Sequence, residues 1–219
     1  MNPAKKSLHA LLLTLAVGSA SAQTPSAPAA LPDAPSAVAH VEPPAVPTGP
    51  TVVFDTTMGR LVCKLFSDQA PITVANFIGL ANGSKTWTDP ITLAKVSGKP
   101  FYDGTTFHRV IPGFMIQGGC PEGTGTGGPG YQIKAEFNRR PDRKHTRGVL
   151  SMARSQNPDS AGSQFFIMHQ DSPHLDGQYS AFGKVTSGIE VVDKIVSVPA
   201  GPSDRPKNPP KIIKITVTE

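Results

Sequence analysis

From residue 105 onward the chain consists of short apolar segments that are separated, in most places, by Gly-rich turns. Apolar runs of this length with such boundaries are typical of β-strands, and about eight or nine strands are expected in all. A sheet of that size exposes no edge if it closes on itself, so the pattern favours a mainly β protein with a closed antiparallel barrel. The expected strands are 51–55, 60–66, 105–111, 113–117, 131–137, 148–153, 163–169, 181–185 and 212–218.

Two segments have the periodicity of helices instead. Pro71 is suited to the first helical position, where its missing N–H costs nothing, and Gly83 fits a C-cap. Between them Val74, Phe77 and Ala81 follow at helical spacing. A second, shorter helix is expected around residues 189–195, whereas the polar stretch 84–100 predicts a loop.

The N-terminus has the features of an export signal. Lys5 and Lys6 precede an apolar run over residues 8–17, and residues 20–22 (Ala-Ser-Ala) fit a cleavage site before Gln23. The run is too short to span a bilayer comfortably, which disfavours the alternative of an uncleaved anchor. Residues 1–22 therefore predict a cleaved signal peptide, a periplasmic or secreted protein, and no membrane attachment afterwards.

The composition of the next segment does not favour a folded structure. Residues 23–50 are dominated by Pro, Ala, Ser and Val and show no apolar periodicity. Such a stretch cannot bury enough surface to offset its ordering entropy, so it predicts a disordered, partly extended linker. About 169 residues remain, which suits one folded domain over 51–219.

Charge and cysteine content exclude some function classes. The net charge is +5, but the basic residues are scattered apart from one group without interleaved aromatics, at residues 139–147. We interpret that group as a solvated loop and expect no nucleic-acid partner. Cys63 and Cys120 have no metal or redox spacing; two free thiols are favoured over a disulfide, which would need Cα atoms within about 7 Å.

One segment combines a permanent cation with apolar side chains and an amide. Residues 107–119 read FHRVIPGFMIQGG, and Arg109 has no carboxylate near it in sequence. Arginine does not give up its proton, so it is a poor general base, but it donates hydrogen bonds in fixed directions. These properties suit a catalyst that stabilises a change of polarity without forming a covalent bond, as rotation about an X–Pro peptide bond requires.

The segment resembles the signature of the cyclophilins, the peptidyl-prolyl cis/trans isomerases, and in particular exported bacterial members. Two further blocks resemble the same family in the same order: residues 148–154 (GVLSMAR) with 162–167 (GSQFFI), and residues 175–177 (LDG) with 182–185 (FGKV). The resemblance covers about residues 51–219. It implies an eight-stranded antiparallel barrel capped by two helices, a monomer, and assisted folding of exported proteins without a cofactor.

The resemblance also implies a site. Arg109, Phe114 and Gln117 would be catalytic: Arg109 would bond the twisted amide and Gln117 the carbonyl before the proline. Phe165 and Phe166 are neighbours in a strand and must face opposite sides, so one serves the core and the resemblance assigns Phe166 to the proline pocket. The implied substrate-binding residues are His108, Met115, Ala153, Arg154, Phe166, His174, Leu175 and Tyr179.

Two of these positions depart from the best-known eukaryotic pattern. His174 stands where those proteins have Trp and Tyr179 where they have His, so weak cyclosporin binding is expected. The expected partners are proline-containing unfolded or partly folded polypeptides. A chaperone-like module that only holds such chains is the main alternative function.

Other chemistry has little support in the sequence. The histidines have no zinc-site spacing, so no metal is expected. The Gly-rich stretch 123–130 lacks the Lys-Ser/Thr ending of a phosphate-binding loop, and we interpret it as a flexible loop bordering the site. No G-x-S-x-G elbow surrounds Ser151 or Ser163, so a hydrolase is not supported.

Overall fold

The computed structural model describes residues 47–137 and 144–218, all within one compact unit, Val41–Glu219. The predicted signal peptide (1–22) and most of the predicted linker (23–50) lie outside the described residues, as do three arginines of the basic group. Gly49 and Pro50 already pair with the folded domain, because backbone hydrogen bonds of about 3.0 Å join them to Leu65. None of the described helices is long and apolar enough to cross a membrane.

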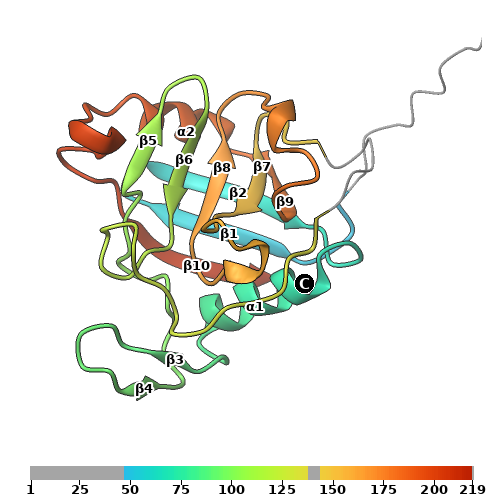
Figure 1. The fold of residues 1–219 in the computed structure, drawn as a ribbon. Coiled ribbons are helices and arrows are strands. Elements are labelled where there is room, and N and C mark those ends of the chain that lie inside the picture. The colour runs from blue at the N-terminus through green and yellow to red at the C-terminus, as the bar shows by residue number, and fades with distance from the viewer. Residues whose placement is uncertain (1–46, 138–143, 219) are drawn as a thin grey trace, which may run out of the picture. The chain divides into compact units, whose positions relative to one another are not determined.

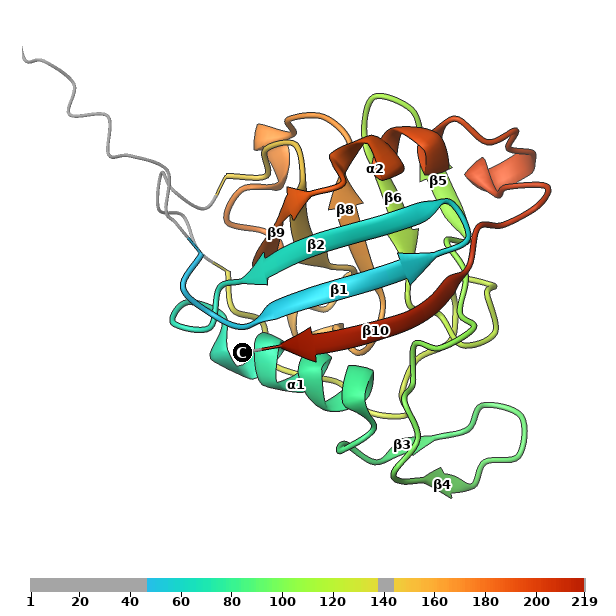
Figure 2. The same cartoon turned by 180° about the vertical axis from the view of Figure 1, so that it is seen from behind.

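Eight strands form one antiparallel sheet in the order β10-β1-β2-β9-β7-β8-β6-β5, and a separate hairpin pairs β3 with β4. Figures 1 and 2 show that the sheet is strongly curved, so that β10, β1 and β2 face β8, β6 and β5 across the interior. The strands are β1 (Thr51–Thr56), β2 (Gly59–Leu65), β3 (Trp87–Thr88), β4 (Lys95–Val96), β5 (Arg109–Ile111), β6 (Met115–Gly118), β7 (Val149–Met152), β8 (Phe165–Met168), β9 (Ala181–Ser187) and β10 (Ile212–Thr218).

The predicted closure of the barrel is wrong, because the sheet is an open half-barrel whose edge strands β5 and β10 form no ladder with each other. Only an isolated bridge, Thr106 to Lys211, and a few backbone bonds beside it cross the gap. β5 begins three residues after this bridge and, in the antiparallel register, runs away from β10. The chain just before it turns at Gly104, where φ is +80° and the backbone N–H bonds Ile212.

The helix α1 (Pro71–Asn82) begins and ends where the sequence predicts. Pro71 opens it, and Gly83 closes it in a left-handed conformation with φ of 79°. Ala70 has no side chain that could cap the first turn. The Glu136 carboxylate does so from 64 residues away, accepting the N–H groups of Ile72 and Thr73 at 2.9 and 2.7 Å.

The second helix, α2 (Ile189–Val196), lies at the opposite end of the curved sheet from α1 (Figures 1 and 2). It buries Val191, Val192, Ile195 and Val196, which recur at helical spacing on one face. Three short 3₁₀ turns complete the described elements: η2 (Pro158–Ser160), η3 (Pro173–Leu175) and η4 (Pro202–Asp204).

Two predicted segments differ from the structure. Residues 131–137 form no strand, and their ladder is limited to one bridge between Ile133 and Ala161. The predicted loop 84–100 contains the small hairpin of β3 and β4, where Trp87 packs edge-on to Phe101 with centroids 5.0 Å apart. Local periodicity does not predict the absence of a strand at 131–137 or the hairpin of β3 and β4, because each depends on contacts with other segments of the chain.

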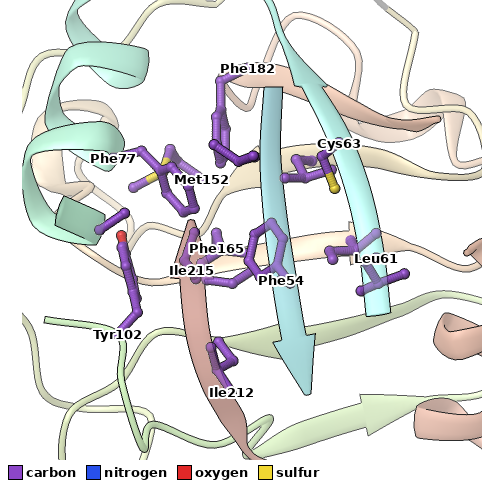
Figure 3. Close-up of a cluster of buried hydrophobic side chains, with 14 of the residues drawn as sticks. Phe54, Leu61, Cys63, Phe77, Tyr102, Met152, Phe165, Phe182, Ile212 and Ile215 are labelled. Atoms are coloured by element: carbon purple, nitrogen blue, oxygen red, sulfur yellow. The ribbon is translucent and has the colours of Figure 1, made fainter. Parts of the chain in front are cut away.

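The main core lies inside the curved sheet and is dominated by aromatic rings (Figure 3). Phe77 of α1 is fully buried, and its ring centroid lies 5.0–5.9 Å from those of four neighbours. These are Phe54, Tyr102, Phe165 and Phe182.

A second, smaller apolar cluster lies on the other side of β8. Phe165 belongs to the main core, whereas Phe166, Met115 and Leu175 belong to this second cluster. The separation of Phe165 from Phe166 confirms the predicted alternation of the two side chains. The outer face of β6 and β8 therefore carries an apolar surface with the 3₁₀ turn η3 beside it.

Candidate active site

A pocket of about 210 Å³ lies over this second cluster. Its walls come from β5, β6, β8, the residues that follow β7, and η3, so that the three sequence blocks meet at one place. The lining residues are Arg109, Phe114, Met115, Gln117, Ala153, Arg154, Phe166, Leu175 and Tyr179. All nine are among the site residues predicted from the sequence.

One wall of the pocket is apolar. Met115, Phe166 and Leu175 are almost fully buried, and Phe114 packs beside them. The Tyr179 ring meets Phe166 edge to face at 5.7 Å. This wall offers a small hydrophobic surface with little freedom to rearrange.

The facing side of the pocket is polar. Arg109 on β5 pairs directly with Gln117 on β6, so both side chains leave the sheet on the same face. The Gln117 amide donates to Gln164 at 2.9 Å, and Arg109 Nε donates to the Asp204 carboxylate at 3.2 Å. No carboxylate is near Arg109 in sequence, yet folding brings one from 95 residues away.

A larger neighbouring cavity, of about 730 Å³, shares Gln117, Ala153 and Arg154 with the pocket. Its far side is the Gly-rich loop, which was expected to border the site. Gln164 holds this loop, because its amide nitrogen donates to the carbonyls of Gly125 and Gly127, each at 2.8 Å. An extended chain seated in the pocket could continue into this cavity.

Sequence reasoning did not single out Gln164 or Asp204. Gln164 stands two residues before Phe166, and strand alternation places both on one face, so this residue could have been found. Asp204 carried no such signal, since the loop around η4 has no periodicity that relates it to β5.

The backbone of Ala153 is only partly available for docking a peptide. Its N–H donates to the Gln164 carbonyl at 3.0 Å, which leaves its carbonyl as the group that could pair with a substrate chain. The Arg154 guanidinium donates to the carbonyls of Gln178 and Ser155 and lies 4.6 Å over the Tyr179 ring. It braces the pocket wall.

Two predicted substrate-binding histidines do not line the pocket. His174 is exposed and stacks on Phe114 with centroids 5.8 Å apart. His108 is 5% exposed, and neither ring nitrogen has a hydrogen-bond partner among the described residues. It lies beneath the Gly-rich loop, where a Cβ on Gly125 would be 3.4 Å from its ring. Substrate contact by either histidine stays a prediction.

A buried polar network supports the pocket floor. His145 is 1% exposed and stacks on Phe166, with ring centroids 6.1 Å apart. Its Nδ1 pairs with the Asp176 carboxylate and its Nε2 with the Ser151 hydroxyl, both at 3.0 Å. These are the residue types of a hydrolase triad, but Ser151 is fully buried and out of reach of a substrate, so we interpret the network as structural.

Acid should destabilise the fold through the two buried histidines. Burial lowers the pKa of His108 and of His145 from the ordinary 6.5, and the Asp176 carboxylate offsets part of the effect at His145. Below pH 6.5 the unfolded chain takes up protons that the folded chain binds less readily, so stability falls as pH falls. Above about pH 7.5 both histidines are neutral in either state and this dependence disappears.

Urea unfolding of the wild type at pH 7.5 and pH 5.5 should show this loss. His108→Leu removes one of the two groups without breaking a hydrogen bond to a described residue, so its pH dependence should be shallower. Equal pH dependence in the two proteins would contradict the assignment to His108.

Among residues 47–137 and 144–218, no group of three His, Cys, Asp or Glu side chains is placed to hold a metal ion. Cys63 and Cys120 are both buried and form no disulfide. Burial raises the pKa of the Cys63 thiol far above its ordinary value, which keeps it protonated and unreactive.

Comparison with known proteins gives a consistent result. Residues 51–217 match the family model described as cyclophilin type peptidyl-prolyl cis-trans isomerase/CLD. Peptidyl-prolyl cis-trans isomerase B of Bacillus subtilis is 54% identical over 131 residues, which are 60% of this chain and 79% of the relative. A probable peptidyl-prolyl cis-trans isomerase A of Mycobacterium leprae is 43% identical over 170 residues, covering 77% of this chain and 92% of the relative.

The fold agrees with solved structures. A cyclophilin-type isomerase of Cryptosporidium parvum, crystallised in the presence of the dipeptide Ala-Pro, superposes with a TM-score of 0.65 at 34% identity. The match covers 77% of this chain and 99% of that one. The chain therefore belongs to the cyclophilin-type peptidyl-prolyl cis-trans isomerases.

Proposed function

We propose that the 210 Å³ pocket binds the proline ring of an X–Pro segment and that Arg109 accelerates rotation of the bond before it. The observation that carries this proposal is the arrangement of Arg109 and Gln117 opposite an apolar wall formed by Met115, Phe166 and Leu175. The solved relative from Cryptosporidium parvum, with its Ala-Pro dipeptide, supports a proline-containing peptide as the substrate class.

The chemistry requires no covalent intermediate. Amide resonance gives a barrier of about 18–20 kcal/mol to rotation. As the bond twists, the prolyl nitrogen becomes pyramidal and regains a lone pair. A guanidinium N–H directed at that nitrogen bonds the twisted state better than the planar one, and only such differential binding speeds the reaction.

The remaining residues would hold the two sides of the rotating bond. The apolar wall fixes the proline ring, while Gln117 donates to the carbonyl before it. The Ala153 carbonyl accepts a backbone N–H of the bound chain, in the manner of extended-peptide docking. Residues further toward the N-terminus of the substrate would lie in the 730 Å³ cavity under the Gly-rich loop.

We further propose that the clients are exported proteins. Lys5, Lys6, the apolar run and the Ala-Ser-Ala site support export to the periplasm or beyond the cell. N-terminal sequencing of the protein recovered from outside the cytoplasm should begin at Gln23. A protein retained in the cytoplasm with its first residues intact would refute the proposal.

The expected response to cyclosporin and the expected assembly state belong to the same proposal. His174 in place of Trp loses an indole donor and contact area, so cyclosporin should bind weakly; a nanomolar inhibition constant would refute this. The protein is proposed to act as a monomer by analogy with its family.

The function is tested by NMR exchange between the cis and trans forms of an Ala-Pro peptide with catalytic amounts of the protein. Accelerated exchange, with shifts at residues lining the pocket, supports isomerisation at this site. Binding without acceleration would favour a module that holds unfolded chains. Acceleration without shifts at the pocket would place the activity elsewhere.

A further inference from the structure

The loop between α2 and β10 has an unusual backbone beside the pocket. Ser203 and Asp204, in η4 (Pro202–Asp204), both have φ of 59°. This is a left-handed backbone conformation that residues other than Gly seldom adopt. Such strain persists only where the surroundings fix it, and it is concentrated at functional sites. The conformation thus raises the question of what this loop holds in place.

The loop is tied down on both sides. Gly201 N–H donates to the Arg205 carbonyl at 2.7 Å, and Lys207 N–H donates to the Pro199 carbonyl at 3.0 Å, so the loop is closed at its neck. The Arg205 guanidinium donates to the Gly123 carbonyl at 2.6 Å, which joins it to the Gly-rich loop. The turn at Asp204 is therefore held between the sheet and the Gly-rich loop.

From this position Asp204 reaches the arginine of the pocket. Its Oδ2 accepts from Arg109 Nε at 3.2 Å, and both side chains are a little over two fifths exposed. Arg109 is one of the pocket residues, so the bond is made at the edge of the site. The contact uses the side of the guanidinium at Nε and leaves both Nη amino groups without a partner among the described residues.

It matters which nitrogens of the guanidinium are bonded, because the group is planar and rigid. A bond at Nε restricts rotation of the plane and leaves the end of the group, between the two Nη nitrogens, free to face a substrate. An arginine held in this way does not have to be ordered at the moment when the substrate amide twists.

We propose that Asp204 is a positioning residue, which holds Arg109 through Nε so that its Nη groups face the bound X–Pro bond. This inference rests on the proposed role of Arg109. It extends the site beyond the three sequence blocks, to the strained turn before β10.

A double-mutant cycle of Arg109→Ala and Asp204→Ala tests the proposal by NMR exchange on the Ala-Pro peptide. Asp204→Ala should lower kcat/KM about threefold to tenfold, a modest loss because the pair is partly exposed. The loss should be in kcat, with peptide affinity within about twofold of wild type, since Asp204 would not touch the substrate. In the Arg109→Ala background, Asp204→Ala should have no further effect.

The matched control is Asp55→Ala. Asp55 accepts from Arg60 Nε at 2.7 Å in the same kind of exposed pair, between β1 and β2. This variant should leave exchange unchanged. An Asp204→Ala variant that behaves like Asp55→Ala, or one that loses as much activity without Arg109 as with it, overturns the inference.

The outcomes separate this inference from the proposed function. Retained activity in Arg109→Ala would refute the role of Arg109 itself, and with it this inference. A large loss in Arg109→Ala with none in Asp204→Ala would refute only the positioning. Where Asp204→Ala fails to fold, Asp204→Asn keeps the shape and one acceptor oxygen, and its activity should lie between those of wild type and Arg109→Ala, because a neutral oxygen holds the guanidinium less strongly than a carboxylate. Wild-type activity in Asp204→Asn would overturn the inference.

Discussion

Replacement of Arg109 by Ala is expected to lower kcat/KM for X–Pro isomerisation by about tenfold to a few hundredfold. A hydrogen bond from a charged donor contributes about 1.5–3 kcal/mol, and each 1.36 kcal/mol of barrier is a factor of ten. Peptide binding should be largely spared, because the apolar wall of Met115, Phe166 and Leu175 remains intact. The remaining acceleration would come from the orientation of the peptide and the exclusion of water.

The measurement is NMR exchange of the Ala-Pro peptide at several peptide concentrations, which separates kcat from affinity. Arg60→Ala is the matched control, since Arg60 also donates through Nε to an aspartate but lies on β2, outside the pocket. Arg109→Lys keeps the charge but not the planar fork, and it should recover only part of the rate. Equal losses in the Arg60 and Arg109 variants would show that the effect is not specific to the site.

The elements predicted best from the sequence are those whose boundaries are set by local chemistry. Pro71 and Gly83 fix the two ends of α1 because each has a backbone preference that few other residues share. The strand pair β1–β2 likewise follows from alternation of more and less buried side chains.

The features that the sequence did not predict depend on which other part of the chain a segment contacts. Alternation shows which residues face inward, but it does not show whether the first and last strands of a sheet meet. Only the segment before β5 bonds the start of β10 among the described residues, and the sheet stays open. Residues 131–137 form no strand, and instead Glu136 within them caps the N-terminus of α1.

The same distinction holds for the site. All of its lining residues except Tyr179 fall in three short blocks, each with a recognisable sequence, and the family resemblance predicted them. The carboxylate that bonds Arg109 lies outside the blocks, 95 residues along the chain at Asp204, where no sequence pattern indicates it. Gln164 lies inside a block and follows strand alternation, so only the assignment of its role was missing.

Replacement of Phe77 by Ala should have the largest effect on stability, a loss of about 3–5 kcal/mol in the free energy of unfolding. The Phe77 ring is fully buried and lies within contact of four other aromatic rings, so its removal leaves a cavity that these large side chains cannot readily fill (Figure 3). A loss of that size is a large fraction of the 5–15 kcal/mol that stabilises a typical domain. Urea unfolding followed by Trp87 fluorescence measures it.

Ile72→Ala is the matched control, because Ile72 is on the same helix but 48% exposed, and its replacement should cost less than about 1 kcal/mol. The Phe77 variant also tests how far the core and the site are independent. Phe77 contacts Phe165, whereas the pocket uses Phe166 on the opposite face of β8. At a temperature where the variant is still folded, its kcat/KM should therefore stay within about twofold of wild type, since β8 keeps its pairing with β6 and β7. A folded variant with strongly reduced activity would show instead that packing of the main core sets the geometry of the pocket through β8.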